Sequence, residues 1–84
     1  MTYFVYVLEC SDKSYYIGST KNLEKRLKQH NELKSGAHYT KIRRPVILKY
    51  SEKVKTYAHA RKREAEIKRF TKAKKEALIK NSTA

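Results

Sequence analysis

Residues 2–10, TYFVYVLEC, form an almost continuously apolar run that is rich in β-branched and aromatic side chains. Such a run predicts a central β-strand that is covered on both faces. The turn-forming residues 11–14 follow, and SYYIGST, residues 14–20, can return as a second strand. The two runs predict an antiparallel hairpin, in which Gly18 marks either a bulge or a close backbone approach.

The middle of the chain predicts one helix and one further strand. Asn22 can cap a helix over residues 23–34, because its side chain suits the N-cap position. Pro45 marks the entry to PVILKYSE, residues 45–52, whose composition is typical of a strand.

The C-terminal part predicts two consecutive helices. Good helix formers dominate from residue 56 to residue 80, and Thr71 can cap the later piece, so helices are expected at 57–69 and 72–80. The fold class is therefore α+β, in the order β-β-α-β-α-α. A single domain is expected over residues 1–80, with a polar tail over residues 81–84.

Net charge is the most informative feature of the composition. The 84 residues include 21 Lys and Arg against 8 Asp and Glu, a formal net charge of +13. This charge attracts polyanions, so DNA is the expected partner, with RNA left open. No apolar run is long enough for a membrane span, no signal peptide is indicated, and one cysteine excludes an internal disulfide. These features predict a cytoplasmic protein associated with the nucleoid; they leave its oligomeric state open.

Most of the basic residues lie in the second half of the chain. Residues 41–84 hold 15 basic and 4 acidic residues. Because they supply charge without an evident base-reading arrangement, their simplest function is to contact phosphates. The predicted nucleic-acid-binding residues are Lys41, Arg43, Arg44, Arg61, Arg63, Lys68, Lys72, Lys74 and Lys75.

The first predicted helix has an unusual inward face. On a helical wheel Leu23, Leu27 and His30 lie within about 60° of one another, and Arg26 lies beside them. Lys25 and Lys28 already supply a solvated face, so that face does not explain Arg26 and His30. The alternatives are a core histidine beneath an arginine at the edge of the core, or one wall of a phosphodiester-cleaving site.

Glu64 is the corresponding anomaly on the later helix. It shares a stripe with Tyr57, Ala60 and Ile67, and a buried carboxylate requires a partner. That partner is either a basic residue, such as Arg26, or a divalent cation such as Mg²⁺, for which a carboxylate is a suitable hard ligand.

Seven tyrosines are present, and several lie in the predicted hairpin. They can be packing residues, or phenols directed at a phosphate or a water molecule. Because side chains alternate between the faces of a strand, Tyr6 and Tyr16 share a face only if paired residue numbers sum to an even number. This condition requires an odd-length loop or a bulge.

Four segments in this order, VYVLEC, YIGST, NLEKRLKQH and KREAEIK, resemble the GIY-YIG nuclease superfamily and especially its small stand-alone bacterial members. Tyr6 corresponds to the tyrosine of the first half-motif, whose glycine is missing, and Tyr16, Ile17 and Gly18 match the second. Arg26 stands at the position of the catalytic arginine.

Two further positions extend the resemblance. His30 matches a position held by His or Tyr, and Glu64 matches the metal-binding glutamate. A late asparagine of the family has no secure counterpart, and Asn81 is a possible stand-in.

The resemblance implies a three-stranded, mainly antiparallel sheet flanked by helices, and hydrolysis of DNA phosphodiester bonds with one Mg²⁺ or Mn²⁺ ion. Glu64 would hold the metal, Arg26 would stabilise phosphate charge, and Tyr16 would orient or deprotonate water with support from Tyr6 or His30. Low sequence specificity and a function in DNA repair or recombination are expected. The alternative is a basic nucleic-acid-binding module whose cleavage is weak or depends on a partner.

Overall fold

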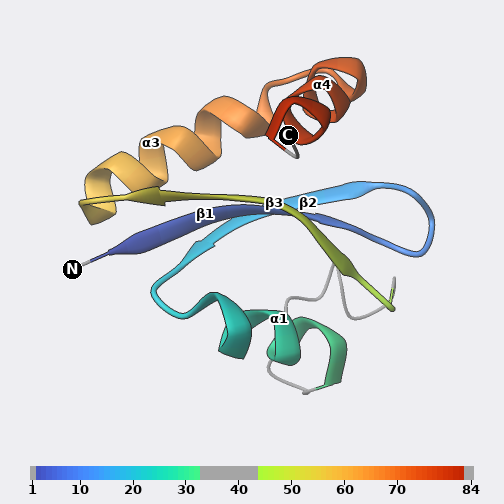
Figure 1. Cartoon of the computed structure of the whole chain (residues 1–84), viewed down its shortest axis with the longest axis horizontal. Helices are drawn as coiled ribbons and strands as arrows, with labels where there is room; N and C mark the ends of the chain where they lie inside the picture. The colour runs from blue at the N-terminus through green and yellow to red at the C-terminus, as the bar shows by residue number, and fades with distance from the viewer. Residues whose placement is uncertain (1, 33–43, 83–84) are drawn as a thin grey trace.

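The computed structural model describes residues 2–32 and 44–82, which form a three-stranded antiparallel sheet with helices on both faces (Figure 1). In chain order the elements are β1 (Tyr3–Glu9), β2 (Tyr15–Thr20), α1 (Leu23–Glu32), β3 (Ile47–Val54), α3 (Tyr57–Lys68) and α4 (Lys72–Ser82). The predicted fold class and the order β-β-α-β-α-α are confirmed.

Strand β1 is the central strand, because the spatial order is β2-β1-β3. Its alternating side chains build two separate cores. Val5 and Val7 pack with Ile17, Val54, Ala60 and Ile67 on one face. Tyr6 and Leu8 pack with Cys10 and Val46 on the other. All four residues at positions 5–8 are buried, as expected for a strand covered on both faces.

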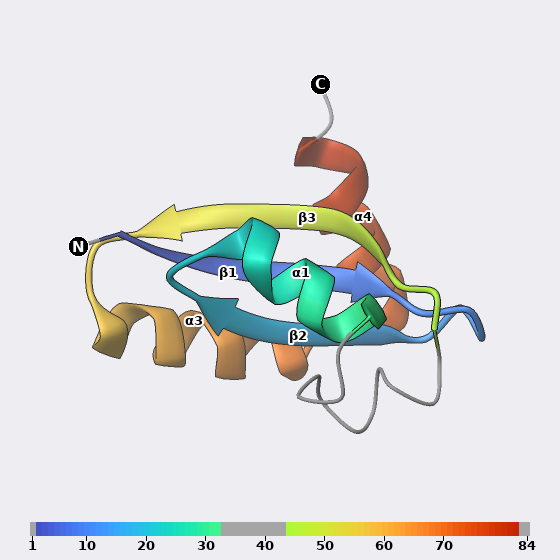
Figure 2. The same ribbon diagram turned by 90° about the horizontal axis from the view of Figure 1, so that it is seen from below.

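The two faces are covered by different helices. Helix α1 lies against one face, and α3 and α4 lie against the other (Figure 1). Helix α3 also follows β2 along the edge of the sheet (Figure 2). None of the helices within residues 2–32 and 44–82 combines the length and the apolar sequence needed to cross a bilayer.

The hairpin register satisfies the condition for a shared tyrosine face. Glu9 pairs with Tyr15 and Tyr6 pairs with Gly18, so paired numbers sum to an even number. The pairing is regular through Gly18, so the predicted bulge is absent, and the group that approaches this glycine closely is the Tyr6 side chain rather than a backbone segment. An irregularity lies instead in the pairing of β1 with β3, between Val7 and Leu8.

Side-chain caps fix the starts of the helices where the sequence predicts them. Asn22 accepts a hydrogen bond from the backbone N–H of Lys25 at 3.0 Å, and Thr71 accepts one from Lys74 at 3.2 Å. Thr56 caps α3 in the same way.

The ends of the elements differ by a few residues from the sequence expectations. Strand β3 continues beyond residue 52, because Val54 pairs with Tyr3 and buries its side chain in the core. Helix α4 continues to Ser82, two residues into the predicted polar tail. Residues 33 and 34 of the first predicted helix lie outside the described residues.

Candidate active site

Three aromatic rings meet beneath α1, on the face of the sheet that Tyr6 and Tyr16 share. The Tyr6 hydroxyl lies 2.9 Å from Nε2 of His30. The Tyr16 ring stands edge-on to the His30 ring, with centroids 5.0 Å apart and an interplanar angle of 87°. Tyr6 and Tyr16 are in edge contact, with centroids 6.5 Å apart. The three rings therefore form one cluster, although they come from β1, β2 and α1.

Gly18 makes room for the Tyr6 ring. It pairs with Tyr6 across the hairpin, and a Cβ atom at Gly18 would lie 2.5 Å from the Tyr6 hydroxyl oxygen and 2.7 Å from Cζ. Both distances are shorter than real Cβ contacts. The glycine thus allows the phenol to lie across β2 and reach His30.

Burial keeps the Tyr6 and His30 side chains of this cluster uncharged near neutral pH. Tyr6 is 1% exposed and His30 is fully buried. Desolvation and the positive charges of Arg26 and Arg44 lower the pKa of His30 to about 4. Desolvation also raises the pKa of Tyr6, although Arg26 acts in the opposite direction. The hydrogen bond between these residues therefore joins a neutral phenol to a neutral imidazole.

Two side-chain contacts hold the C-terminal part of α1 in place. The Asn31 amide accepts from the backbone N–H of Val46 at 2.7 Å and donates to its carbonyl at 3.0 Å. The Arg44 guanidinium donates to the backbone carbonyls of His30 and Gln29. Because His30 lies in this turn, both contacts fix its ring against the sheet. Arg44, predicted to contact phosphates, instead binds the helix, and we leave it out of the proposed nucleic-acid surface.

Arg26 lies one turn before His30, at the rim of the cluster. Its guanidinium donates to the Gln29 side-chain oxygen at 3.0 Å and lies close enough to Tyr6 to influence its pKa. Arg26 and Gln29 also line an open pocket with Ser19, Thr20 and neighbouring residues. The arginine thus borders both the buried phenol and solvent, a suitable position for contacting a bound phosphate.

Glu64 lies on α3, beside the edge strand β2 that also carries Tyr16. Ser19 donates a hydrogen bond to Oε1 at 2.9 Å, and the Lys68 ammonium binds Oε2 at 2.9 Å. The carboxylate side chain is 19% exposed, and its negative charge reaches Tyr6. Of the two partners considered from the sequence, a basic residue is present, and it is Lys68 rather than Arg26.

The surroundings of Glu64 fit a metal ion that brings many of its own ligands. Within residues 2–32 and 44–82, no three His, Cys, Asp or Glu side chains gather into a metal-binding group. Glu64 and the Ser19 hydroxyl are both oxygen donors, and Mg²⁺ commonly keeps several waters and binds substrate phosphates. The donor set therefore fits a shared Mg²⁺ or Mn²⁺ ion, provided that Lys68 releases the carboxylate.

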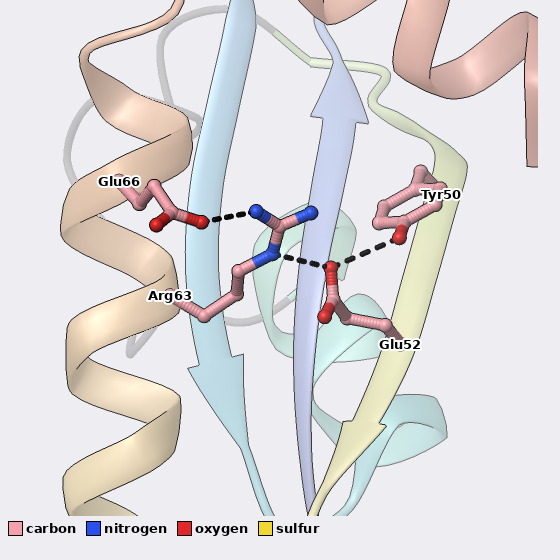
Figure 3. Close-up of polar contacts among 4 residues, drawn as sticks. All are labelled: Tyr50, Glu52, Arg63 and Glu66. Atoms are coloured by element: carbon pink, nitrogen blue, oxygen red, sulfur yellow. Dashed lines mark hydrogen bonds and ion pairs between the residues drawn. The ribbon is translucent and has the colours of Figure 1, made fainter.

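Arg63, another predicted phosphate contact, is enclosed by acidic side chains. Its Nε donates to Glu52 at 2.8 Å, and NH1 pairs with Glu66. Tyr50 donates to the same Glu52 oxygen at 2.9 Å (Figure 3). This network ties α3 to β3. Since two carboxylates neutralise the guanidinium, we also leave Arg63 out of the proposed nucleic-acid surface.

The other predicted nucleic-acid-binding residues divide into three groups. Lys41 and Arg43 lie outside the described residues. Arg61 lies on α3, and Lys72 and Lys74 lie at the start of α4, all exposed. Lys68 and Lys75 line a pocket together with Tyr15, Tyr16 and Ile17, and so lie close to the tyrosine cluster. Asn81 is exposed near the end of α4.

Two contributors to the site, Ser19 and Asn31, were not identified from the sequence, and the contact of a third, Lys68, with Glu64 was not predicted. Lys68 was predicted only as a phosphate contact, although its position four residues after Glu64 is a signal for an ion pair. Ser19 could have been found from the alternation of β2, which gives it the same face as Ile17. Asn31 offered no local signal, because its partner Val46 follows a separate segment.

Comparisons with known proteins identify the family of this chain. The model of the family described as the GIY-YIG catalytic domain matches residues 2–77. A UPF0213 protein of Syntrophus aciditrophicus is 53% identical over 79 residues, which cover 94% of this chain and 91% of that protein. A UPF0213 protein of Staphylococcus aureus is 49% identical over 79 residues, which cover 94% of this chain and 95% of that protein.

Solved structures show the same fold. A solution structure of an E. faecalis protein has a TM-score of 0.66 and 41% identity, and the match covers 96% of this chain and 85% of that one. The solution structure of a UPF0213 protein from Bacillus halodurans has a TM-score of 0.60 and 36% identity, with coverage of 95% and 84%. The predicted resemblance to small bacterial members is confirmed, and the chain belongs to the GIY-YIG family of nuclease domains.

Proposed function

We propose that the protein is a divalent-metal-dependent endonuclease that hydrolyses DNA phosphodiester bonds with low sequence specificity. The observation that supports this proposal most strongly is the tyrosine–histidine cluster under Arg26, together with Glu64, which Ser19 holds on the other side of the edge strand β2. Packing alone does not require a fully buried hydroxyl–imidazole pair at this position. The basic surface supplies attraction to the phosphate backbone, which carries no sequence information.

Tyr16 is the proposed contact to the attacking water. It is partly exposed and lines the pocket with Lys68 and Lys75, whereas Tyr6 and His30 are buried. Tyr16 would orient the water. After losing its own proton to solvent it would accept the water proton, as the new P–O bond forms and the bond from phosphorus to the leaving oxygen breaks. Tyr6 and His30 are positioning residues in this mechanism, because their hydrogen bond and ring contacts fix the Tyr16 ring from behind.

Arg26 is the proposed electrophilic group. Its guanidinium stands at the rim of the cluster, where it can donate to the non-bridging oxygens of the scissile phosphate and stabilise the charge that develops there. Its hydrogen bond to the neutral Gln29 amide orients the guanidinium without cancelling its charge.

Glu64 is the proposed metal ligand, assisted by the Ser19 hydroxyl. A bound Mg²⁺ or Mn²⁺ would supply Lewis-acid stabilisation of the phosphate and of the leaving oxygen. Lys68 would leave Glu64 and contact a phosphate instead.

The cleavage experiment uses supercoiled, linear, single-stranded and branched DNA, each with Mg²⁺, Mn²⁺ or EDTA. We expect cutting that requires the metal and is lost in Arg26→Ala and in Glu64→Gln. Lys28→Ala, which removes an exposed charge from the outer side of α1, is the matched control. Cutting by both variants at the wild-type rate would contradict the proposed site.

A second candidate function is a basic nucleic-acid-binding module whose cleavage is weak or depends on a partner. The observation in its favour is that Ser19 and Lys68 already bind both Glu64 oxygens. DNA binding without cutting of any substrate, unchanged by Glu64→Gln, would support the module. For either function we propose that the protein acts on DNA in the cytoplasm, in association with the nucleoid. As a nuclease it would function in DNA repair or recombination.

A further inference from the structure

One stripe of α3 carries residues suited to nucleic acid along its whole length. Tyr57, Arg61, Glu64 and Lys68 follow one another at spacings of four, three and four residues, so they lie on one side of the helix. At 1.5 Å per residue the stripe is about 17 Å long. The helix thus presents an aromatic ring, two cations and the proposed metal ligand in a row.

Strand β2 supplies a matching stripe. Tyr15 and Ser19 point to the same face, Lys21 follows directly, and the strand is also about 17 Å long at 3.3 Å per residue. The hydrogen bond from Ser19 to Glu64 fixes the two stripes relative to each other. We call the line between them the β2–α3 seam; it runs along the edge of the sheet (Figure 2).

One end of the β2–α3 seam is an aromatic and cationic cluster. The Tyr3 and Tyr57 ring centroids are 5.9 Å apart. The Lys21 ammonium lies 5.6 Å from the Tyr3 centroid, and the Arg61 guanidinium lies 5.9 Å from that of Tyr57. Tyr57 is 57% exposed, which is high for a large aromatic side chain, so much of its ring is open to solvent.

The other end has the same composition. The Lys72 ammonium lies 5.9 Å from the Tyr15 ring centroid. Tyr15 also lines an open pocket with Tyr16, Lys68 and Lys75. Desolvation, together with the negative charges of Glu76 and Glu9, raises the pKa of Tyr15, so its ring stays neutral beside a phosphate.

Two such clusters on either side of Glu64 indicate the form of nucleic acid that fits. Aromatic faces stack on bases only where the bases are unpaired, while a duplex hides its base faces and offers mainly phosphates. A length of about 17 Å corresponds to about five nucleotides at 3.4 Å spacing, and to fewer in an extended strand.

We propose that the β2–α3 seam binds a single-stranded segment of nucleic acid. Its bases stack on Tyr57 and Tyr15, and its phosphates contact Arg61, Lys68 and Lys75. The middle of the segment lies over Glu64. This inference rests on the proposed function, because it names the substrate of the same site.

Fluorescence anisotropy in EDTA tests the inference separately from cleavage. The probes are a ten-nucleotide dU strand, a U strand of the same length and a DNA duplex of the same length. We expect the single strands to bind at least about five-fold more tightly than the duplex, the lower limit expected from stacking of one base. Tyr57→Leu should lose about five-fold or more in single-strand affinity while leaving duplex affinity unchanged, and Tyr57→Phe should retain it.

A charge-matched pair tests the phosphate contacts. Lys68→Ala/Lys75→Ala should weaken single-strand binding and lower its salt slope by about 2, because each lost contact lowers it by about 1. Lys28→Ala/Lys53→Ala removes the same charge from exposed positions on α1 and β3 and should have a much smaller effect.

The possible outcomes separate this inference from the proposed function. Equal affinity for duplex and single strands, with no effect of Tyr57→Leu, would overturn the inference even if the protein cuts DNA. Equal losses in the two lysine pairs would also overturn it. Single-strand binding that depends on Tyr57 would support it even if no cutting occurs. Tighter binding of the dU strand or of the U strand would assign the sugar, because these two probes carry the same base.

Discussion

Two polar clusters, on opposite faces of the sheet, each join a tyrosine to an arginine, and they differ in what faces the guanidinium. Between β3 and α3, Arg63 binds the carboxylates of Glu52 and Glu66, and Tyr50 donates to Glu52 (Figure 3). Beneath α1, Arg26 binds the uncharged amide oxygen of Gln29 and lies beside the Tyr6 phenol.

The difference separates a structural arginine from one that suits catalysis. Two carboxylates neutralise Arg63, and the three side chains together tie a helix to a strand. Arg26 is oriented by a neutral group, so its positive charge remains available to an incoming phosphate. We therefore propose different functions for identical residue types because of their neighbours, and each cluster can be tested by removing one member.

Removing the Arg26 guanidinium should have the largest effect. We expect Arg26→Ala to lower the rate of DNA cleavage about 10²- to 10³-fold, the usual result of removing a group that stabilises transition-state charge. The free energy of unfolding should change little, because the lost hydrogen bond involves a partly exposed amide. Single-turnover cleavage and urea denaturation measure the two effects. A large loss of stability with an unchanged rate would place Arg26 with Arg63, as a structural residue.

The buried histidine should make the α1 cluster sensitive to acid. Its pKa is lowered to about 4 in the folded chain, whereas an unfolded histidine has a pKa near 6.5. The unfolded chain therefore binds more protons between these values, and stability falls as the pH is lowered from about 6.5 to about 4. The expected loss is about 3 kcal/mol.

Urea denaturation across this pH range measures the histidine effect. His30→Gln should remove this part of the pH dependence, whereas His59→Gln, at an exposed position on α3, should keep it. The same pH dependence in His30→Gln and in the wild type would mean that another group is responsible.

The sequence was sufficient for the arrangement of elements because each one carries its own periodic signal. The apolar run of β1, the caps Asn22 and Thr71 and the tyrosine alternation in the hairpin all act locally. The inward positions of His30 and Glu64 also follow from helical spacing, since a helix has only one buried side.

Partner identities were predictable only where both members lie on one helix. Glu64 and Lys68 are four residues apart, and this pair could have been expected from spacing. The contacts of Arg63 with Glu52 and of Arg44 with α1 join separate elements, so they depend on distances that only the folded chain sets. Charge count alone therefore does not distinguish cations that are engaged within the fold from cations that are open to a phosphate.

Gly18 offers a milder way to disturb the α1 cluster. A Cβ atom there would lie 2.5 Å from the Tyr6 hydroxyl oxygen, so the ring must move and its hydrogen bond with His30 must weaken. We expect Gly18→Ala to lower the free energy of unfolding by about 2 kcal/mol, a usual cost of overpacking, and to slow cleavage. Thermal or urea denaturation measures the first effect. In a Tyr6→Leu background the same change should cost less, because the clashing atoms are absent; an equal cost in both backgrounds would argue against the clash.

Removing Arg63 should have the smallest effect, and it tests the comparison from the structural side. Arg63→Ala leaves Glu52 without its cation in a site where both side chains are about a quarter exposed, so we expect a loss of about 1–2 kcal/mol in urea denaturation. Cleavage and DNA affinity should stay near wild type, because the two carboxylates already cancel the charge of the guanidinium. Arg63→Met/Glu52→Met should recover part of the lost stability, since no charge is then left without a partner. A fall in DNA affinity as large as that caused by Lys68→Ala would mean that Arg63 reaches the phosphates despite Glu52 and Glu66. Neighbouring carboxylates would then not distinguish Arg63 from Arg26.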